Sequence, residues 1–165
     1  MTLYHLNVFV HVLAAVVWLG GMFFLAAVGA PVIRTLEPAG LRRQLFESIG
    51  RQFRGLGWLA IAVLLATGIG NIHFRGLLTA EVWTGPDFWL GTNYGRTLAA
   101  KLVLVTAMVA VQALHDFWLG PAAGRAEPGT PQTKTLRRWA SWMARGNALL
   151  GVALLWVAVG LARGG

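Results

Sequence analysis

Residues 6–33 read LNVFVHVLAAVVWLGGMFFLAAVGAPVI, an apolar run without a single Asp, Glu, Lys or Arg. A membrane-spanning helix needs about 20 consecutive, predominantly apolar residues, and this run exceeds that length. Three further apolar runs follow at residues 56–74, 98–120 and 139–162. The four runs predict an all-α integral membrane protein, an antiparallel four-helix bundle that forms a single transmembrane domain over residues 1–165.

The composition supports lipid as the solvent for much of the surface. Hydrophobic residues make up 56% of the chain and charged residues 12%, a balance that one soluble core of this size does not hide. The chain has no Cys, which excludes disulfides, iron–sulfur clusters and thiolate metal sites.

The formal net charge of +8 is unevenly distributed. Two segments between apolar runs hold most of it: Arg34, Arg42, Arg43, Arg51 and Arg54 in the first, and Arg125, Lys134, Arg137 and Arg138 in the second. The positive-inside rule places both segments in the cytoplasm and both termini outside. We therefore expect a multi-pass protein of the bacterial inner membrane with the lipid bilayer, and no nucleic acid, as its partner.

The three connecting segments differ in kind. Residues 34–54 mix Arg with apolar residues at near-helical spacing, which predicts an interfacial amphipathic helix or a cytoplasmic extension of the second membrane helix. Residues 121–134 are rich in Pro and Gly and predict a flexible connector. Residues 76–94 are aromatic, which indicates an interfacial anchor or a lid over a site between the outer helix ends.

Histidines gather at the predicted outer surface. His11 lies about two turns into the first helix, with Trp18 on nearly the same face. His73 lies at the end of the antiparallel second helix and therefore in the same membrane leaflet as His11. His5 lies at the outer end of the first helix. Imidazole binds copper, zinc and haem iron. The alternatives are that His11 is a hydrogen-bonded interior residue and that His5 and His73 are interfacial.

The third apolar run carries a polar stripe. Lys101, Met108, Gln112 and His115 fall within about 40° of one helix face. They indicate an interior face that relays protons or steadies a cofactor, although Lys101 can snorkel and His115 with Asp116 can be interfacial.

The fourth run carries two polar residues near its start. Arg145 is expected to snorkel to lipid phosphates. Asn147 cannot reach the surface in this way and should form a hydrogen bond to another helix.

Three segments resemble the CopD copper-resistance domain. They are residues 11–21 (HVLAAVVWLGG), the pair Thr67-Gly68, and residues 94–102 (YGRTLAAKL). The resemblance implies copper uptake or translocation across the inner membrane, with His11 as the residue most directly matched. The same pattern, with Arg145 and Asn147, is similar to that of the HemJ-type protoporphyrinogen oxidases, which are four-helix membrane proteins associated with haem.

Three functional hypotheses follow. The first is a copper-handling protein that binds a copper ion through His11, His73 and His5 and works with a periplasmic copper protein. The second is a small b-type cytochrome, an oxidoreductase-like protein in which His11 and His73 hold haem b beside Trp18. Lys101 or Arg96 would then pair with a propionate, and electrons would pass to or from quinone. The third is a cofactor-free accessory subunit of a respiratory or copper-protein assembly.

Overall fold

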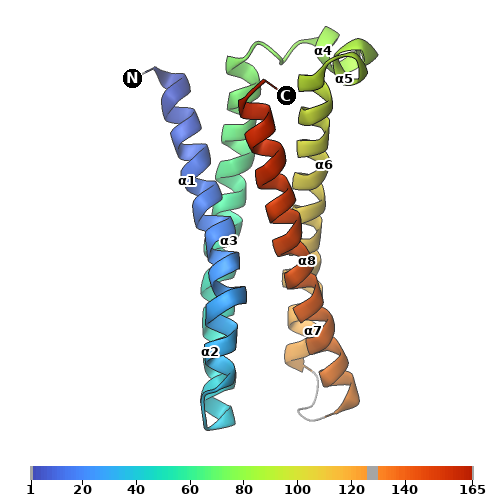
Figure 1. Ribbon diagram of the computed structural model, residues 1–165. Coiled ribbons are helices and arrows are strands. Elements are labelled where there is room, and N and C mark those ends of the chain that lie inside the picture. Colours follow the sequence, from blue (N-terminus) through green and yellow to red (C-terminus); the bar gives the residue numbers. More distant parts are fainter. Residues whose placement is uncertain (1, 126–129, 165) are drawn as a thin grey trace. The chain divides into compact units, whose positions relative to one another are not determined.

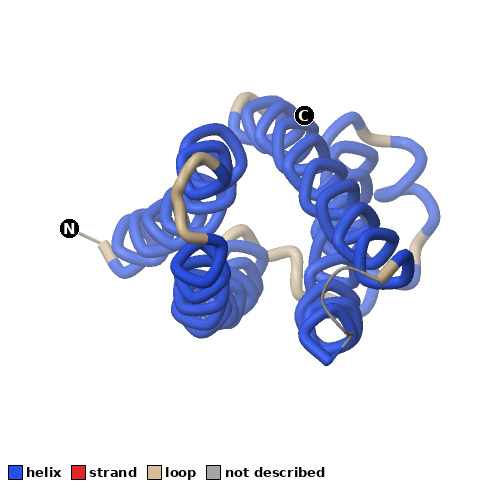
Figure 2. Tube along the Cα trace, turned by 90° about the horizontal axis from the view of Figure 1, so that it is seen from below, coloured by secondary structure: helices blue, strands red, loops and turns tan. Residues whose placement is uncertain are grey.

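The computed structural model describes residues 2–125 and 130–164. Within these ranges the chain consists of helices joined by short loops and contains no strand (Figure 2). The prediction of an all-α fold is therefore confirmed. The packing of the four helices into one bundle and the orientation of the termini stay predictions. Contacts divide the chain into two compact units, Met1–Thr79 and Ala80–Gly165.

The first unit is an antiparallel pair of long helices (Figure 1). Asn7, near the start of one helix, contacts Asn71, near the end of the other. Further along, Gly21 packs against Phe53. The elements are α1 (Leu3–Phe24), η1 (Leu25–Gly29), α2 (Ala30–Arg34) and α3 (Ala39–Phe74).

The second unit is also built around an antiparallel pair, in which Thr97 lies near Gly160 and Gln112 contacts Asn147. Two short helices precede the pair. The elements are α4 (Ala80–Thr84), α5 (Pro86–Gly91), α6 (Asn93–Ala113), η2 (Leu114–Leu119), α7 (Gly120–Arg125) and α8 (Pro131–Ala162).

Four helical stretches of the described chain are long and apolar enough to cross a membrane. They are Leu3–Arg34, Ala39–Phe74, Asn93–Ala122 and Pro131–Ala162. Many large apolar side chains on them are exposed, among them Phe9, Leu59 and Trp156. A soluble protein rarely exposes so much apolar surface, so lipid contact explains the composition of these helices.

The helices run further than the apolar runs alone predict. The second starts at Ala39, so of the two alternatives for residues 34–54 the structure shows a helix continuous with the second membrane helix over most of the segment. The prediction of a flexible connector over residues 121–134 is wrong for most of that segment. Residues 121–125 belong to α7, residues 131–134 open α8 with Thr130 as its cap, and residues 126–129 lie outside the described residues.

Two π-helical segments, η1 and η2, keep the first and third spans continuous. Each is closed by an i to i−5 hydrogen bond, from the N–H of Ala30 to the carbonyl of Leu25 and from that of Gly120 to His115. Pro31 and Pro121 follow directly. In a regular α-helix a proline ring clashes with the carbonyl four residues earlier. The wider π turn is how these helices accommodate a proline.

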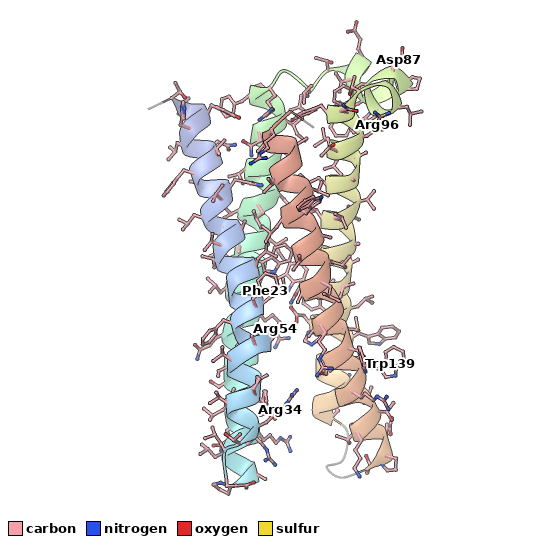
Figure 3. All side chains as sticks on the ribbon, viewed as in Figure 1. Phe23, Arg34, Arg54, Asp87, Arg96 and Trp139 are labelled. Atoms are coloured by element: carbon pink, nitrogen blue, oxygen red, sulfur yellow. The ribbon has the colours of Figure 1, made fainter. Side chains whose placement is uncertain are left out.

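Most charged residues of the first unit lie at the turn between α2 and α3 and along the first half of α3. Arg34 lies where α2 turns into α3, and Arg54 lies further along α3 (Figure 3). Arg42 contacts Glu37 and Arg43 contacts Glu47 in exposed ion pairs. The apolar part of the pair lies beyond this basic end, as expected of a helix hairpin whose turn lies at a membrane surface.

The aromatic segment forms a compact joint between α5 and α6. Trp83 and Phe88 each contact Trp89, with ring centroids 5.2 and 5.1 Å apart. Arg96 lies at this joint (Figure 3) and donates hydrogen bonds to the Leu90 carbonyl and to Asn93. Its guanidinium therefore holds the end of α5.

Gly95 is required at this joint by a close approach. A Cβ at this position would lie 1.9 Å from the Phe88 carbonyl oxygen and 2.9 Å from Thr92 Oγ1. The N–H of Gly95 also donates to Thr92 Oγ1, which caps α6. The glycine in the Tyr94-Gly95-Arg96 motif thus allows α5 to fold back onto α6.

We expect Gly95→Ala to destabilise the second unit by about 1–3 kcal/mol, the usual cost of overpacking a tight contact. Thermal unfolding in detergent and the fluorescence of Trp83 and Trp89 would measure the change. Gly91→Ala is the control, because nothing lies within 4 Å of its Cβ position. Equal stability of the two variants would contradict this account of Gly95.

Candidate functional site: a histidine held between two helices

Four polar side chains meet between α1 and α3 in the first unit. The amide nitrogen of Asn7 donates to the Thr67 carbonyl and to Asn71 Oδ1, both at 2.9 Å. One turn further along α1, His11 Nδ1 lies 2.8 Å from Thr67 Oγ1. These residues all lie in membrane-spanning stretches, where polar side chains are costly unless they bind one another.

The Thr67 hydroxyl determines which nitrogen of His11 carries a proton. Thr67 Oγ1 lies 2.6 Å from the Val63 carbonyl oxygen, to which it must donate its single hydrogen. The hydroxyl can then only accept from His11 Nδ1. In the neutral ring the proton is therefore on Nδ1 and the lone pair on Nε2, which is the atom that can bind a metal.

Two glycines of α3 lie against these polar side chains. A Cβ on Gly68 would lie 3.7 Å from His11 Cε1, an ordinary packing distance, so the ring lies against this part of α3. A Cβ on Gly70 would lie 2.6 Å from Asn7 Oδ1, so the close approach of Asn7 requires glycine there. The pair Thr67-Gly68 therefore supplies a hydrogen-bond acceptor and a surface against which the imidazole packs.

Trp18 continues the same face of α1 at the α3 interface. Its side chain is 2% exposed and packs against Gly57. The indole N–H has no hydrogen-bond partner among the described residues, although a buried Trp usually finds one. Trp18 thus packs at the helix interface about two turns from His11.

His5 lies near the start of α1 and His73 near the end of α3, and both side chains are exposed. This end of the helix pair, away from the turn between α2 and α3, is called its open end below. His5 hydrogen-bonds the Thr2 hydroxyl and its ring packs edge-on against Tyr4. His73 contacts Phe74. His73 is six residues after Thr67, which places it about 120° around α3 from the face that holds His11. The described residues include no group of three or more His, Cys, Asp or Glu able to hold a metal ion.

The second unit contains a separate chain of polar contacts. Asn147 on α8 donates to Gln112 Oε1 at 3.3 Å, and Gln112 donates to Asp116 Oδ2 at 2.8 Å. His115 Nδ1 lies 3.0 Å from Asp116 Oδ1. The predicted hydrogen bond from Asn147 to another helix is confirmed. The Asp116 side chain is only 8% exposed, and the interfacial position of His115 with Asp116 stays a prediction.

The remaining predicted residues lie at other places in the second unit. Lys101 is half-buried on α6, and Met108 is fully buried. Arg145 is exposed, with its guanidinium 5.5 Å from the centre of the Trp142 ring. Arg96 serves the joint described above, and its pairing with a haem propionate stays a prediction.

Sequence reasoning missed Asn7 and the burial of Asp116. Asn7 precedes His11 by four residues, so it shares the helix face of His11, and this spacing was an available signal. Asp116 follows Gln112 by four residues in the same way. Its burial depends on the packing of α8 against η2, which no local pattern reports.

Fold and site together define a multi-pass helical membrane protein with an imidazole held inside a helix pair. The family model of copper resistance protein D (CopD) matches residues 47–161. The chain therefore belongs to the CopD family. The match includes Thr67-Gly68 and residues 94–102, whereas residues 11–21 lie before it.

One curated relative extends the comparison. An uncharacterized protein of Aquifex aeolicus (strain VF5) is 27% identical over 155 residues, which cover 93% of this chain and 92% of the relative. No solved structure matches the chain. Membership of the CopD family makes this a membrane protein of copper resistance and copper handling.

Proposed function

We propose that the protein takes up or translocates copper across the bacterial inner membrane and that His11 Nε2 is the central ligand. The hydrogen bond between His11 and Thr67 carries this proposal. It fixes the ring between two helices with the metal-binding nitrogen unprotonated. A ligating histidine is usually held in this way through its other nitrogen.

The other donors of the first unit suit a pathway of successive contacts. His5 and His73 lie near the open end of the helix pair and would offer exposed imidazoles to copper arriving from a periplasmic copper protein. Met22 follows His11 by eleven residues, which returns it to within about 20° of the same face of α1. Its thioether is the soft ligand that Cu(I) prefers. Copper is the cargo in this proposal, and the protein acts as a transporter.

Copper binding to the protein in lipid nanodiscs tests the proposal. We expect stoichiometric copper in the wild type and an affinity at least about tenfold lower in His11→Ala, because the central ligand is removed. His115→Gln, in the other unit, is the control and should bind copper as the wild type does. Unchanged copper binding in His11→Ala would overturn the assignment of His11.

The same samples separate the alternatives. A Soret band in the visible spectrum that disappears in His11→Ala would identify a b-type cytochrome and contradict copper transport through this histidine. Protein made with ample copper and haem that binds neither would indicate an accessory subunit.

A further inference from the structure

The second unit buries a carboxylate within a helical stretch that is apolar enough to cross a membrane. Asp116 lies in the stretch Asn93–Ala122, six residues before its end, and its side chain is 8% exposed. Ionisable side chains in such positions are costly and characteristically mark proton relays or ion pathways. The copper site proposed in the first unit makes no use of Asp116.

Both oxygens of this carboxylate have defined partners. Gln112 donates to Oδ2, and Asn147 on α8 donates in turn to Gln112 and so orients its amide. His115 Nδ1 contacts Oδ1 at 3.0 Å. The carboxylate is contacted from α6 and η2, and α8 supports the α6 contact through Asn147, so the carboxylate is held in place rather than free to turn toward the surface.

His115 and Asp116 are neighbours in the chain but differ in how exposed their side chains are. His115 and Asp116 both lie in the π-helix η2, a feature frequent at functional sites. The His115 side chain is 35% exposed, whereas that of Asp116 is buried. One member can therefore exchange with the surroundings while the other holds charge in the interior.

The remaining charged groups on elements packed against η2 are distributed along the unit. Arg145 lies over Trp142, and Lys101 is half-buried. Exposed charged groups on these elements include Arg96 on α6, Arg125 on α7, and Lys134 and Arg138 on α8. The basic side chain in contact with Asp116 is His115, whose Nδ1 lies 3.0 Å from Oδ1.

We propose that His115 and Asp116 form a proton-binding site that exchanges one proton with the nearer membrane surface. A hydronium ion at the membrane surface donates a proton to His115 Nε2 and becomes water, and the proton on Nδ1 passes to Asp116 Oδ1. One O–H bond of the hydronium ion and the N–H bond at Nδ1 break as the new N–H and O–H bonds form. The imidazole stays neutral with its proton on the other nitrogen, and the carboxylate becomes a neutral carboxyl group. This site is independent of the copper site.

Infrared spectra of the protein in nanodiscs, recorded as a function of pH, test the proposal without copper. We expect a carbonyl stretching band of a protonated carboxyl group that changes with pH and is lost in Asp116→Asn. This variant preserves the shape of the side chain and its capacity to accept from Gln112. Asp87→Asn is the control, because Asp87 is an exposed acid on α5 (Figure 3).

His115→Gln tests the relay itself and keeps the carboxyl group. Glutamine can donate to Oδ1 but cannot pass a proton through its side chain. Exchange of the carboxyl proton for deuterium in D₂O should be at least about tenfold slower than in the wild type, since a positioned acid–base group is removed. A carboxyl region unchanged by Asp116→Asn, or equal exchange rates in His115→Gln and wild type, would overturn the proposal.

Discussion

Replacing Thr67 by valine is expected to weaken copper binding by about 10- to 100-fold, although Thr67 itself contacts no metal in the proposed site. The loss of a second residue that orients a ligating histidine typically has an effect of this size. Valine keeps the branched shape of threonine and removes the oxygen that accepts from His11 Nδ1. The proton of the imidazole is then free to move to Nε2, which blocks metal binding.

Competition with a chromogenic Cu(I) chelator would measure the affinity, and Thr67→Ser should retain most of it. Nitrogen-15 NMR of the metal-free protein supplies a readout independent of copper. It should show the Nδ1–H tautomer of His11 in the wild type and a mixture in Thr67→Val. Thr97→Val is a matched control, because Thr97 makes the same hydroxyl contact to the carbonyl four residues earlier, in the other unit. Equal copper affinity and an unchanged tautomer in Thr67→Val would show that the hydroxyl does not orient the ring.

The apolar runs predicted the existence of four membrane helices but not where three of them begin. Hydropathy reports the part of a helix that lies in lipid. The basic segment 39–55 continues the second helix beyond that part. Helix formation there depends on backbone hydrogen bonds and on ion pairs such as that between Arg43 and Glu47. A hydropathy pattern does not report these interactions.

The structural effect of the two prolines was not predicted from the sequence. Pro31 and Pro121 do not end their helices; each is preceded by a π turn. An i to i−5 turn requires one extra residue to be accommodated in the helix.

The antiparallel arrangement of α1 and α3 predicts the depth of the histidines but not the direction of their side chains. Antiparallel threading correctly brings the end of α3 beside the start of α1, and it places Thr67 opposite His11. It does not bring His73 to the same face, because helical phase, not depth, decides which way a side chain points. His73 as a copper ligand remains a prediction of the proposed pathway.

Gly70→Ala is expected to lower the free energy of unfolding by about 1–2 kcal/mol, the range found for hydrogen bonds between membrane helices. The new methyl group would lie 2.6 Å from Asn7 Oδ1 and 3.1 Å from its Cγ. Asn7 must move, and its hydrogen bonds to the Thr67 carbonyl and to Asn71 are lost.

Gly55→Ala on the same helix isolates this effect, because nothing lies within 4 Å of its Cβ position. Both substitutions replace glycine within α3 and bring a similar gain in helix propensity. Unfolding titrations with SDS in mixed micelles would measure both free energies. Gly55→Ala should match or exceed the stability of the wild type, whereas Gly70→Ala should fall below it. If both variants gain stability equally, the contact between Asn7 and α3 does not hold the helix pair together, and the positioning of His11 one turn away does not depend on Asn7.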